Sequence, residues 1–252
     1  LYMGIQNFIN HISSGMIPVL IDIGDVCGHG YEIIDDHVRI WINHLLYRDV
    51  DLDYIRKLIP VDIRDGRLLI TEEDRFYYEN RIRGIFCSPD GLKNRYTSRE
   101  TIIIAEPPVV GYNAFGIIVK GTNIIQVRPI TGCNMNCIFC SVDEGPYSIR
   151  RIRDFYVIHD VLVEEFRRIA SDRKKCDLEA HIDGQAEPTI YPELVDLVQE
   201  LSEIDNVRKI SIQTNGTLLT EEMVDELCEA GLTRINLSLH TLDRDKAQVL
   251  FG

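Results

Sequence analysis

Three of the chain's seven cysteines fall within eight consecutive positions. Cys133, Cys137 and Cys140 lie in the segment ITGCNMNCIFCSVDEGP (130–146), directly after an apolar run. Thiolates this close together bind a soft metal centre, either zinc or an iron–sulfur cluster. A structural zinc site usually has four ligands, and the remaining cysteines at 27, 87, 176 and 228 lie apart from one another. A cubane cluster held by three thiolates would leave one iron open to an outside ligand.

The overall composition argues against a general nucleic-acid-binding protein, a membrane-spanning protein and a secreted disulfide-rich protein. With 252 residues and 45% apolar content, the chain can form a substantial core or two domains. A formal net charge of -13 gives no general basic surface for a long nucleic acid. No apolar run approaches the about 18 residues of a membrane span. An odd number of scattered cysteines does not resemble a secreted disulfide framework, so we expect a reducing, cytoplasmic location.

Both ends of the chain are unusual. It begins with Leu1 rather than Met, and it stops soon after a predicted helix start in TLDRDKAQV (241–249). We expect a longer protein to supply the rest.

Strands and helices alternate from about residue 123 onward. Period-2 and helical spacing of apolar residues predict strands over 123–130, 177–183, 207–214 and 233–240, and helices over 153–172, 191–201 and 220–231. Thr220 is the predicted N-cap of the last of these helices and Gly231 its C-terminal stop. This alternation indicates a parallel sheet with right-handed crossovers.

Each of the four strands is polar on one face and apolar on the other. The polar positions are Gln126, Arg128, Glu179, His181, Asp183, Ser211, Gln213, Asn215, Asn236, Ser238 and His240. Because helices already cover the apolar face, the pattern favours a curved sheet around a polar cavity, a full or partial barrel, over a merely solvated face. His181, Asp183 and His240 either contact a substrate or fill the barrel interior as hydrogen-bonded groups.

Residues 1–122 are predicted to form an N-terminal α+β accessory domain. Helices are expected over 30–49 and 51–58, followed by a hairpin over 61–70 that turns at Asp65-Gly66. The segment 88–100 is expected to be a polar loop or linker.

Three more motifs follow the cysteines in order, each at the end of a predicted strand. They are DGQAEPTIYPEL (183–194), QTNGTLL (213–219) and LSLHTLD (237–243), and Phe139 precedes the last cysteine of the triplet. Together these motifs resemble the radical SAM superfamily, in particular its molybdenum-cofactor and peptide-modifying members. The resemblance covers 123–250, about half the chain. It implies a partial (β/α)6 TIM-like barrel with about four β/α units present, so the predicted core is 123–252, truncated at its C-terminus.

The resemblance also implies a cofactor set and a reaction. Cys133, Cys137 and Cys140 would hold a [4Fe-4S] cluster whose open iron is chelated by S-adenosyl-L-methionine. Reductive cleavage of that cofactor would give a 5'-deoxyadenosyl radical, which abstracts hydrogen from a substrate. An electron donor such as ferredoxin or flavodoxin would be needed.

Binding roles carry over to individual positions. Phe139 would border the adenine, and Gln185, Ala186 and Glu187 would receive the methionine amino group. Thr214, Asn215 and Ser238 are candidates for the carboxylate or the ribose. Gln185 and Ala186 stand where the motif has two glycines, so their side chains could crowd the ligand.

The substrate stays open between a peptide or protein, an RNA, and a small molecule such as a cofactor precursor. No catalytic side chain is assigned. The alternative outside enzymology is a non-catalytic iron–sulfur or zinc-binding module, because fold-level analogy does not choose a reaction.

Overall fold

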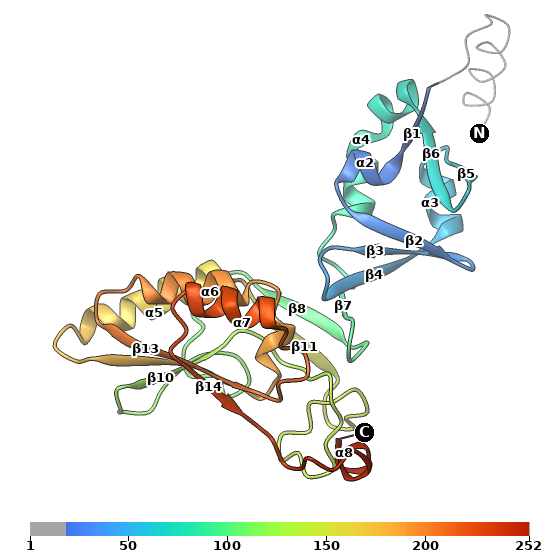
Figure 1. Cartoon of the computed structure of the whole chain (residues 1–252). Coiled ribbons are helices and arrows are strands. Elements are labelled where there is room, and N and C mark those ends of the chain that lie inside the picture. The colour runs from blue at the N-terminus through green and yellow to red at the C-terminus, as the bar shows by residue number, and fades with distance from the viewer. Residues whose placement is uncertain (1–18, 252) are drawn as a thin grey trace, which may run out of the picture. The chain divides into compact units, whose positions relative to one another are not determined.

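The computed structural model describes residues 19–251 of the chain (Figure 1). The chain divides into two compact units, one ending at Leu92 and one beginning at Lys93. No helix in the described part of the chain is long and apolar enough to cross a membrane.

The first unit is an α+β fold. Its strands are β1 (Leu20–Asp22), β2 (Gly30–Ile34), β3 (His37–Trp41), β4 (Leu46–Asp51), β5 (Asp62–Arg64) and β6 (Arg67–Thr71), and its helices are α2 (Ile23–Cys27), α3 (Leu52–Leu58) and α4 (Glu72–Phe86). Strands β2, β3 and β4 form an antiparallel meander, and β6 pairs with both β1 and β5. Buried side chains from both sets of strands and all three helices form one hydrophobic core.

The sequence prediction for this unit was partly right. The hairpin over 61–70 is confirmed as β5–β6, with both Asp65 and Gly66 at positive φ, and the helix over 51–58 is confirmed as α3. The helix predicted over 30–49 is wrong, because this segment forms β2, β3 and β4. Val38 and Ile40 are both buried, and this alternation fits a strand. The Asn43 side chain accepts hydrogen bonds from the amides of Leu45 and Leu46, which forms the turn between β3 and β4.

The second unit contains the predicted barrel strands. Its strands are β7 (Lys93–Asn94), β8 (Glu100–Ile104), β9 (Gly116–Val119), β10 (Ile124–Arg128), β11 (Arg153–Val157), β12 (Leu178–Ile182), β13 (Val207–Thr214) and β14 (Arg234–Leu237). Its helices are α5 (His159–Asp172), the short 3-10 helix η1 (Pro188–Ile190), α6 (Leu194–Ser202), α7 (Glu221–Glu229) and α8 (Arg244–Phe251).

The main sheet has the order β14-β13-β12-β10-β9. Strands β10, β12, β13 and β14 run parallel, and β9 is antiparallel to β10. A helix follows β12, β13 and β14 directly, and α5 follows β10 after the intervening strand β11; α5, α6 and α7 lie on one side of the sheet (Figure 1). The predicted α/β architecture with about four β/α units of a partial barrel is confirmed.

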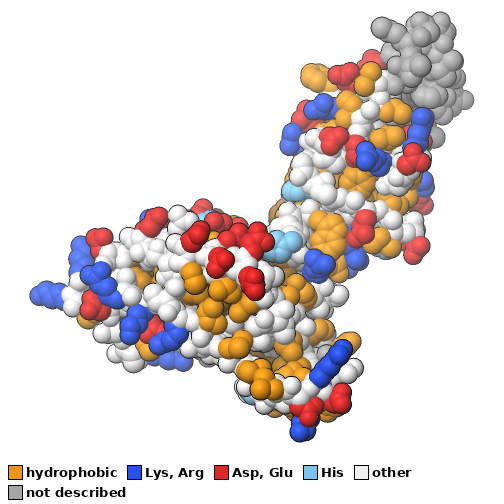
Figure 2. All heavy atoms as spheres, in the orientation of Figure 1, with side chains coloured by type: hydrophobic (Ala, Val, Ile, Leu, Met, Phe, Trp, Pro, Cys, Tyr) orange, Lys and Arg blue, Asp and Glu red, His pale blue; other side chains and the backbone are white. Residues whose placement is uncertain are grey.

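Burial follows the two-faced pattern of the strands. The helix-covered face is fully buried at Ile125, Val127, Ala180, Ile182 and Ile212. Strand β14 is the exception, because it lies at the edge of the sheet and leaves Leu237 more than half exposed. The strand predicted over 233–240 ends at Leu237, so Leu239, also more than half exposed, lies beyond it. Acidic side chains gather over α6 and α7 on the outer surface (Figure 2).

Two segments of this unit differ from expectation. The helix predicted over 153–172 begins only at His159, because residues 153–157 form β11 in parallel pairing with β8. The expected loop over 88–100 contains buried Asn94 and Thr97. Residues 93–122 pack within the second unit, and the functional division at residue 122 stays a prediction.

Candidate metal centre and cofactor site

The three clustered cysteines lie in the loop that joins β10 to β11, at the carboxyl end of β10. All three are free thiols. The Cys133 amide donates to the Glu144 carbonyl at 3.0 Å, and the Cys140 amide donates to the Cys137 carbonyl at 3.0 Å. The end of α8 accepts two more loop amides, from Asn136 and Ile138. Backbone hydrogen bonds therefore define the shape of this cysteine loop (residues 129–152).

Gly145 allows the cysteine loop to close on itself. A Cβ atom at this position would lie 2.5 Å from the Met135 carbonyl oxygen and 3.0 Å from the Asn136 Cα atom. Neither backbone atom can move without displacing the residues between Cys133 and Cys137. The glycine of the Gly145-Pro146 pair that follows the cysteines is therefore required by the packing of the loop.

We expect Gly145→Ala to lower the iron bound per chain severalfold, because the added methyl group overpacks the loop. The measurement is iron and sulfide content after anaerobic reconstitution. Gly84→Ala is the matched control, because a Cβ atom there meets nothing within 4 Å. Unchanged iron content in Gly145→Ala would contradict the packing argument.

Burial and the neighbouring cysteines make ionisation of the clustered thiols unfavourable. Burial raises the pKa of Cys133 to about 11, with further contributions from Glu187, Cys137 and Cys140. Burial and the neighbouring Cys140 also raise the pKa of Cys137. Three adjacent thiolates are costly without a bound cation, so this donor set fits a metal centre.

The number of thiols distinguishes between kinds of centre. The cysteine loop holds three cysteines, whereas a structural zinc site usually has four ligands. A cubane iron–sulfur cluster held by three thiolates leaves one iron open to an outside ligand. The three-thiol donor set therefore fits an iron–sulfur cluster better than a structural zinc.

Glu187 joins the ends of β12 and β13 beside the cysteine loop. Its carboxylate is 2% exposed and accepts four hydrogen bonds: from the Thr189 amide and hydroxyl, from the Thr214 hydroxyl at 2.6 Å, and from the Asn215 amide at 2.7 Å. The Glu187 amide donates to the Gly132 carbonyl at 3.0 Å. Glu187 and Thr214 thus brace the strand ends with their side chains.

Asn215 connects β13 to the cysteine loop. Its side-chain amide donates to the Cys133 sulfur at 3.7 Å and to Asn134 Oδ1 at 3.0 Å. Asn134 in turn donates to the Thr217 hydroxyl at 2.8 Å. The sequence prediction missed Asn134 and Thr217, because an asparagine between two cysteines carries no signal until β13 is placed beside it.

Phe139 lies against His240, with ring centroids 4.6 Å apart, and also contacts Phe251 of α8. The Ser238 amide donates to the Thr214 carbonyl at 2.8 Å, and the Ser238 hydroxyl accepts from Gln213. Residues from the cysteine loop, the end of β13 and the segment after β14 therefore meet at one edge of the sheet.

Comparison with known proteins agrees with this arrangement. A family model described as the radical SAM superfamily matches residues 127–251. Residues 127–251 belong to the radical SAM superfamily.

Three proteins with similar sequences match different lengths of this chain. An uncharacterized protein of Methanocaldococcus jannaschii is 52% identical over 226 residues, which are 86% of this chain and 51% of that protein. The GTP 3',8-cyclase of Peptoclostridium acidaminophilum is 31% identical over 129 residues, 51% of this chain and 37% of the cyclase. The GTP 3',8-cyclase of Thermodesulfovibrio yellowstonii is 29% identical over 133 residues, 52% of this chain and 39% of the cyclase. The chain spans about half the length of the first relative and less of the two cyclases.

Gln185 and Ala186, both predicted from the sequence to lie at cofactor-binding positions, make different contacts with the cysteine loop. Ala186 forms a parallel bridge with Gly132 of the cysteine loop. Gln185 accepts a hydrogen bond from Arg151 at 2.9 Å. The larger side chain is therefore engaged by a residue of the loop that carries the cysteines.

The polar face of the radical SAM sheet is a hydrogen-bonded network. His181 pairs with Ser211 at 2.7 Å, and Ser211 donates to Glu179. Arg128 pairs with Asp183 at 3.1 Å, and Arg234 pairs with Glu179. Each arginine of this face therefore meets a carboxylate.

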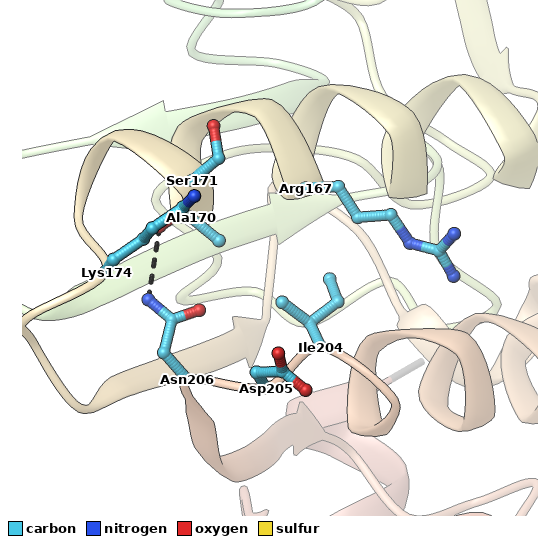
Figure 3. Close-up of a pocket in the computed structure, with 7 residues that line it drawn as sticks. All are labelled: Arg167, Ala170, Ser171, Lys174, Ile204, Asp205 and Asn206. Carbon is cyan, nitrogen blue, oxygen red and sulfur yellow. Dashed lines mark hydrogen bonds between the residues drawn. The ribbon is translucent and has the colours of Figure 1, made fainter.

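A surface hollow of about 350 Å³ lies away from this site (Figure 3). It is lined by residues at the end of α5 and before β13, where Asn206 donates to the Ala170 carbonyl at 3.2 Å. These residues lie at the amino ends of the parallel strands, whereas the cysteines lie at the carboxyl ends. The hollow is separate from the radical SAM site.

Proposed function

We propose that this protein is a radical SAM enzyme, with residues 123–252 as its core and 1–122 as an accessory domain. When bound at Cys133, Cys137 and Cys140, a [4Fe-4S] cluster with S-adenosyl-L-methionine supplies a 5'-deoxyadenosyl radical for hydrogen abstraction. The observation that carries the proposal is the loop of three free thiols at the carboxyl end of β10, within residues 127–251 that match the radical SAM family model.

The chain's own groups hold and orient the centre. The Met135 amide donates to the Cys133 sulfur at 3.4 Å, and the Asn215 side chain donates to it at 3.7 Å. Such N–H···S bonds stabilise negative charge on a ligating sulfur and adjust its redox potential. The Asn215 donor is fixed, since Asn215 is held by Glu187 and by Asn134.

The cofactor-binding assignments form part of the same proposal. Phe139 is suited to border an adenine because it is 47% exposed beside His240. Ser238 offers a polar group for the carboxylate or ribose. The Thr214 hydroxyl already donates to Glu187, and the Asn215 side chain donates to Cys133 and Asn134, so these two candidates would first have to exchange those partners for the cofactor. Glu187 contributes through the backbone that it positions, because its carboxylate accepts four hydrogen bonds.

The substrate belongs to one of three classes: a peptide or protein, an RNA, or a small cofactor precursor. Internal pairing of Arg128 with Asp183 and of Arg234 with Glu179 supports recognition by hydrogen bonds over recognition through phosphates. The proposal includes a ferredoxin or flavodoxin as electron donor, oxidoreductase chemistry and a cytoplasmic location.

Electron paramagnetic resonance tests the proposal directly. The full chain is reconstituted anaerobically, reduced, and measured with and without S-adenosyl-L-methionine. We expect a reduced [4Fe-4S] signal whose shape changes when the cofactor is added. A signal that ignores the cofactor would favour the non-catalytic iron–sulfur module, and a site that takes zinc but no iron would favour a zinc module.

A further inference from the structure

Arg151 connects two segments that build the proposed cofactor site. Its Nε atom lies 2.7 Å from Glu144 Oε1 in the cysteine loop. Its Nη2 atom donates to Gln185 Oε1 at 2.9 Å, beyond the end of β12. One guanidinium therefore joins the loop that carries the cysteines to the segment 185–187. We call Glu144, Arg151 and Gln185 the Arg151 bridge.

Glu144 fixes the position of this guanidinium. Its side chain is 1% exposed, and neither carboxylate oxygen has a hydrogen-bond partner within the described residues. The cations near it are Arg151 at 2.7 Å and Arg99 at 3.8 Å. A carboxylate buried without hydrogen bonds needs a close cation. The Glu144 carbonyl also accepts the amide of Cys133, so the bridge begins beside the first cysteine.

Gln185 is the other end of the bridge. By the resemblance of its sequence motif, Gln185 takes the place of a glycine, which would have no side chain to offer Arg151. The next two residues contact the cysteine loop through the backbone: Ala186 pairs with Gly132, and the Glu187 amide donates to the Gly132 carbonyl. The side-chain contact of Gln185 thus adds to a backbone contact between the same two segments.

We propose that Gln185 and Arg151 are positioning residues that set the affinity for S-adenosyl-L-methionine by holding segment 185–187 against the cysteine loop. This inference rests on the proposed function. In this inference the Arg151 bridge positions segment 185–187 for the cofactor, and the three cysteines bind the cluster without help from the bridge.

The test compares Gln185→Leu, which removes the acceptor at similar size, with Gln185→Glu, which keeps an acceptor for Arg151. Both variants should bind iron as the unsubstituted chain does. In an electron paramagnetic resonance titration, Gln185→Leu should need about tenfold more S-adenosyl-L-methionine for the half-maximal signal change, as expected for one charge-assisted hydrogen bond. Gln185→Glu should retain most of the affinity.

Arg151→Lys supplies a double-mutant cycle, since lysine keeps a cation near Glu144 without the forked geometry of arginine. Gln185→Leu should weaken cofactor binding less in the Arg151→Lys chain than in the unsubstituted chain. Equal effects in both backgrounds, or unchanged binding in Gln185→Leu, would overturn the inference while leaving the proposed function intact. If the unsubstituted chain ignores S-adenosyl-L-methionine, the proposed function itself fails.

Discussion

Replacing Cys133, Cys137 or Cys140 with alanine is expected to remove the cluster. Each thiol is one of only three in the cysteine loop, and the other free cysteines at 27, 87, 176 and 228 lie on other elements. Iron content should fall from about four atoms per chain to near zero, since all three thiolates anchor the same cluster. Colorimetric iron and sulfide analysis, with the visible absorbance of the reconstituted protein, measures this loss.

Cys87→Ala and Cys228→Ala are the matched controls, because both thiols are exposed and neither lies in the cysteine loop. They should retain full iron content. Far-ultraviolet circular dichroism of all the variants separates cluster loss from unfolding. If any triplet variant keeps a complete cluster, the ligand assignment is wrong at that position.

The sequence predicted the sheet of the second unit well because its local and tertiary signals agree. Strand β12 alternates buried apolar and half-buried polar side chains, and β13 alternates polar and apolar residues from Lys209 to Gln213, as a helix-covered half barrel requires. Thr220 accepts the Met223 amide at 3.1 Å, so the predicted N-cap of α7 is confirmed. The structure of such strands and helix ends can be predicted from the residues next to one another in the sequence.

Predictions failed where tertiary contacts override the local pattern. In β11, Asp154 is fully buried and pairs with Arg99, which is distant in the sequence. No periodicity reveals that a charged residue lies in the interior. The Arg151 bridge was missed for the same reason, since Arg151 stands beside Arg150 and Ile152 in a run that is typical of a surface.

Replacing Glu187 with alanine is expected to destabilise the second unit by about 3–4 kcal/mol, because three buried donors and one part-buried donor lose a charged acceptor. Thr189 and Thr214 are buried with it, so water cannot replace the carboxylate without opening the strand ends. In Glu187→Gln the side chain keeps its size and one accepting oxygen, but the new amide nitrogen would face a hydrogen-bond donor where Glu187 has its second oxygen. It should cost less, about 1–2 kcal/mol.

The measurement is urea unfolding followed by two probes, since the two units can unfold separately. The single tryptophan, Trp41, lies in β3 of the first unit, so its fluorescence reports that unit. Hydrogen exchange of the β12 and β13 amides reports the second. The exchange-detected free energy of unfolding should fall in Glu187→Ala while the fluorescence midpoint stays constant. Equal stability of Glu187→Ala and the unsubstituted chain would mean that the carboxylate does not brace the strand ends, and that Glu187 is free to serve the cofactor directly.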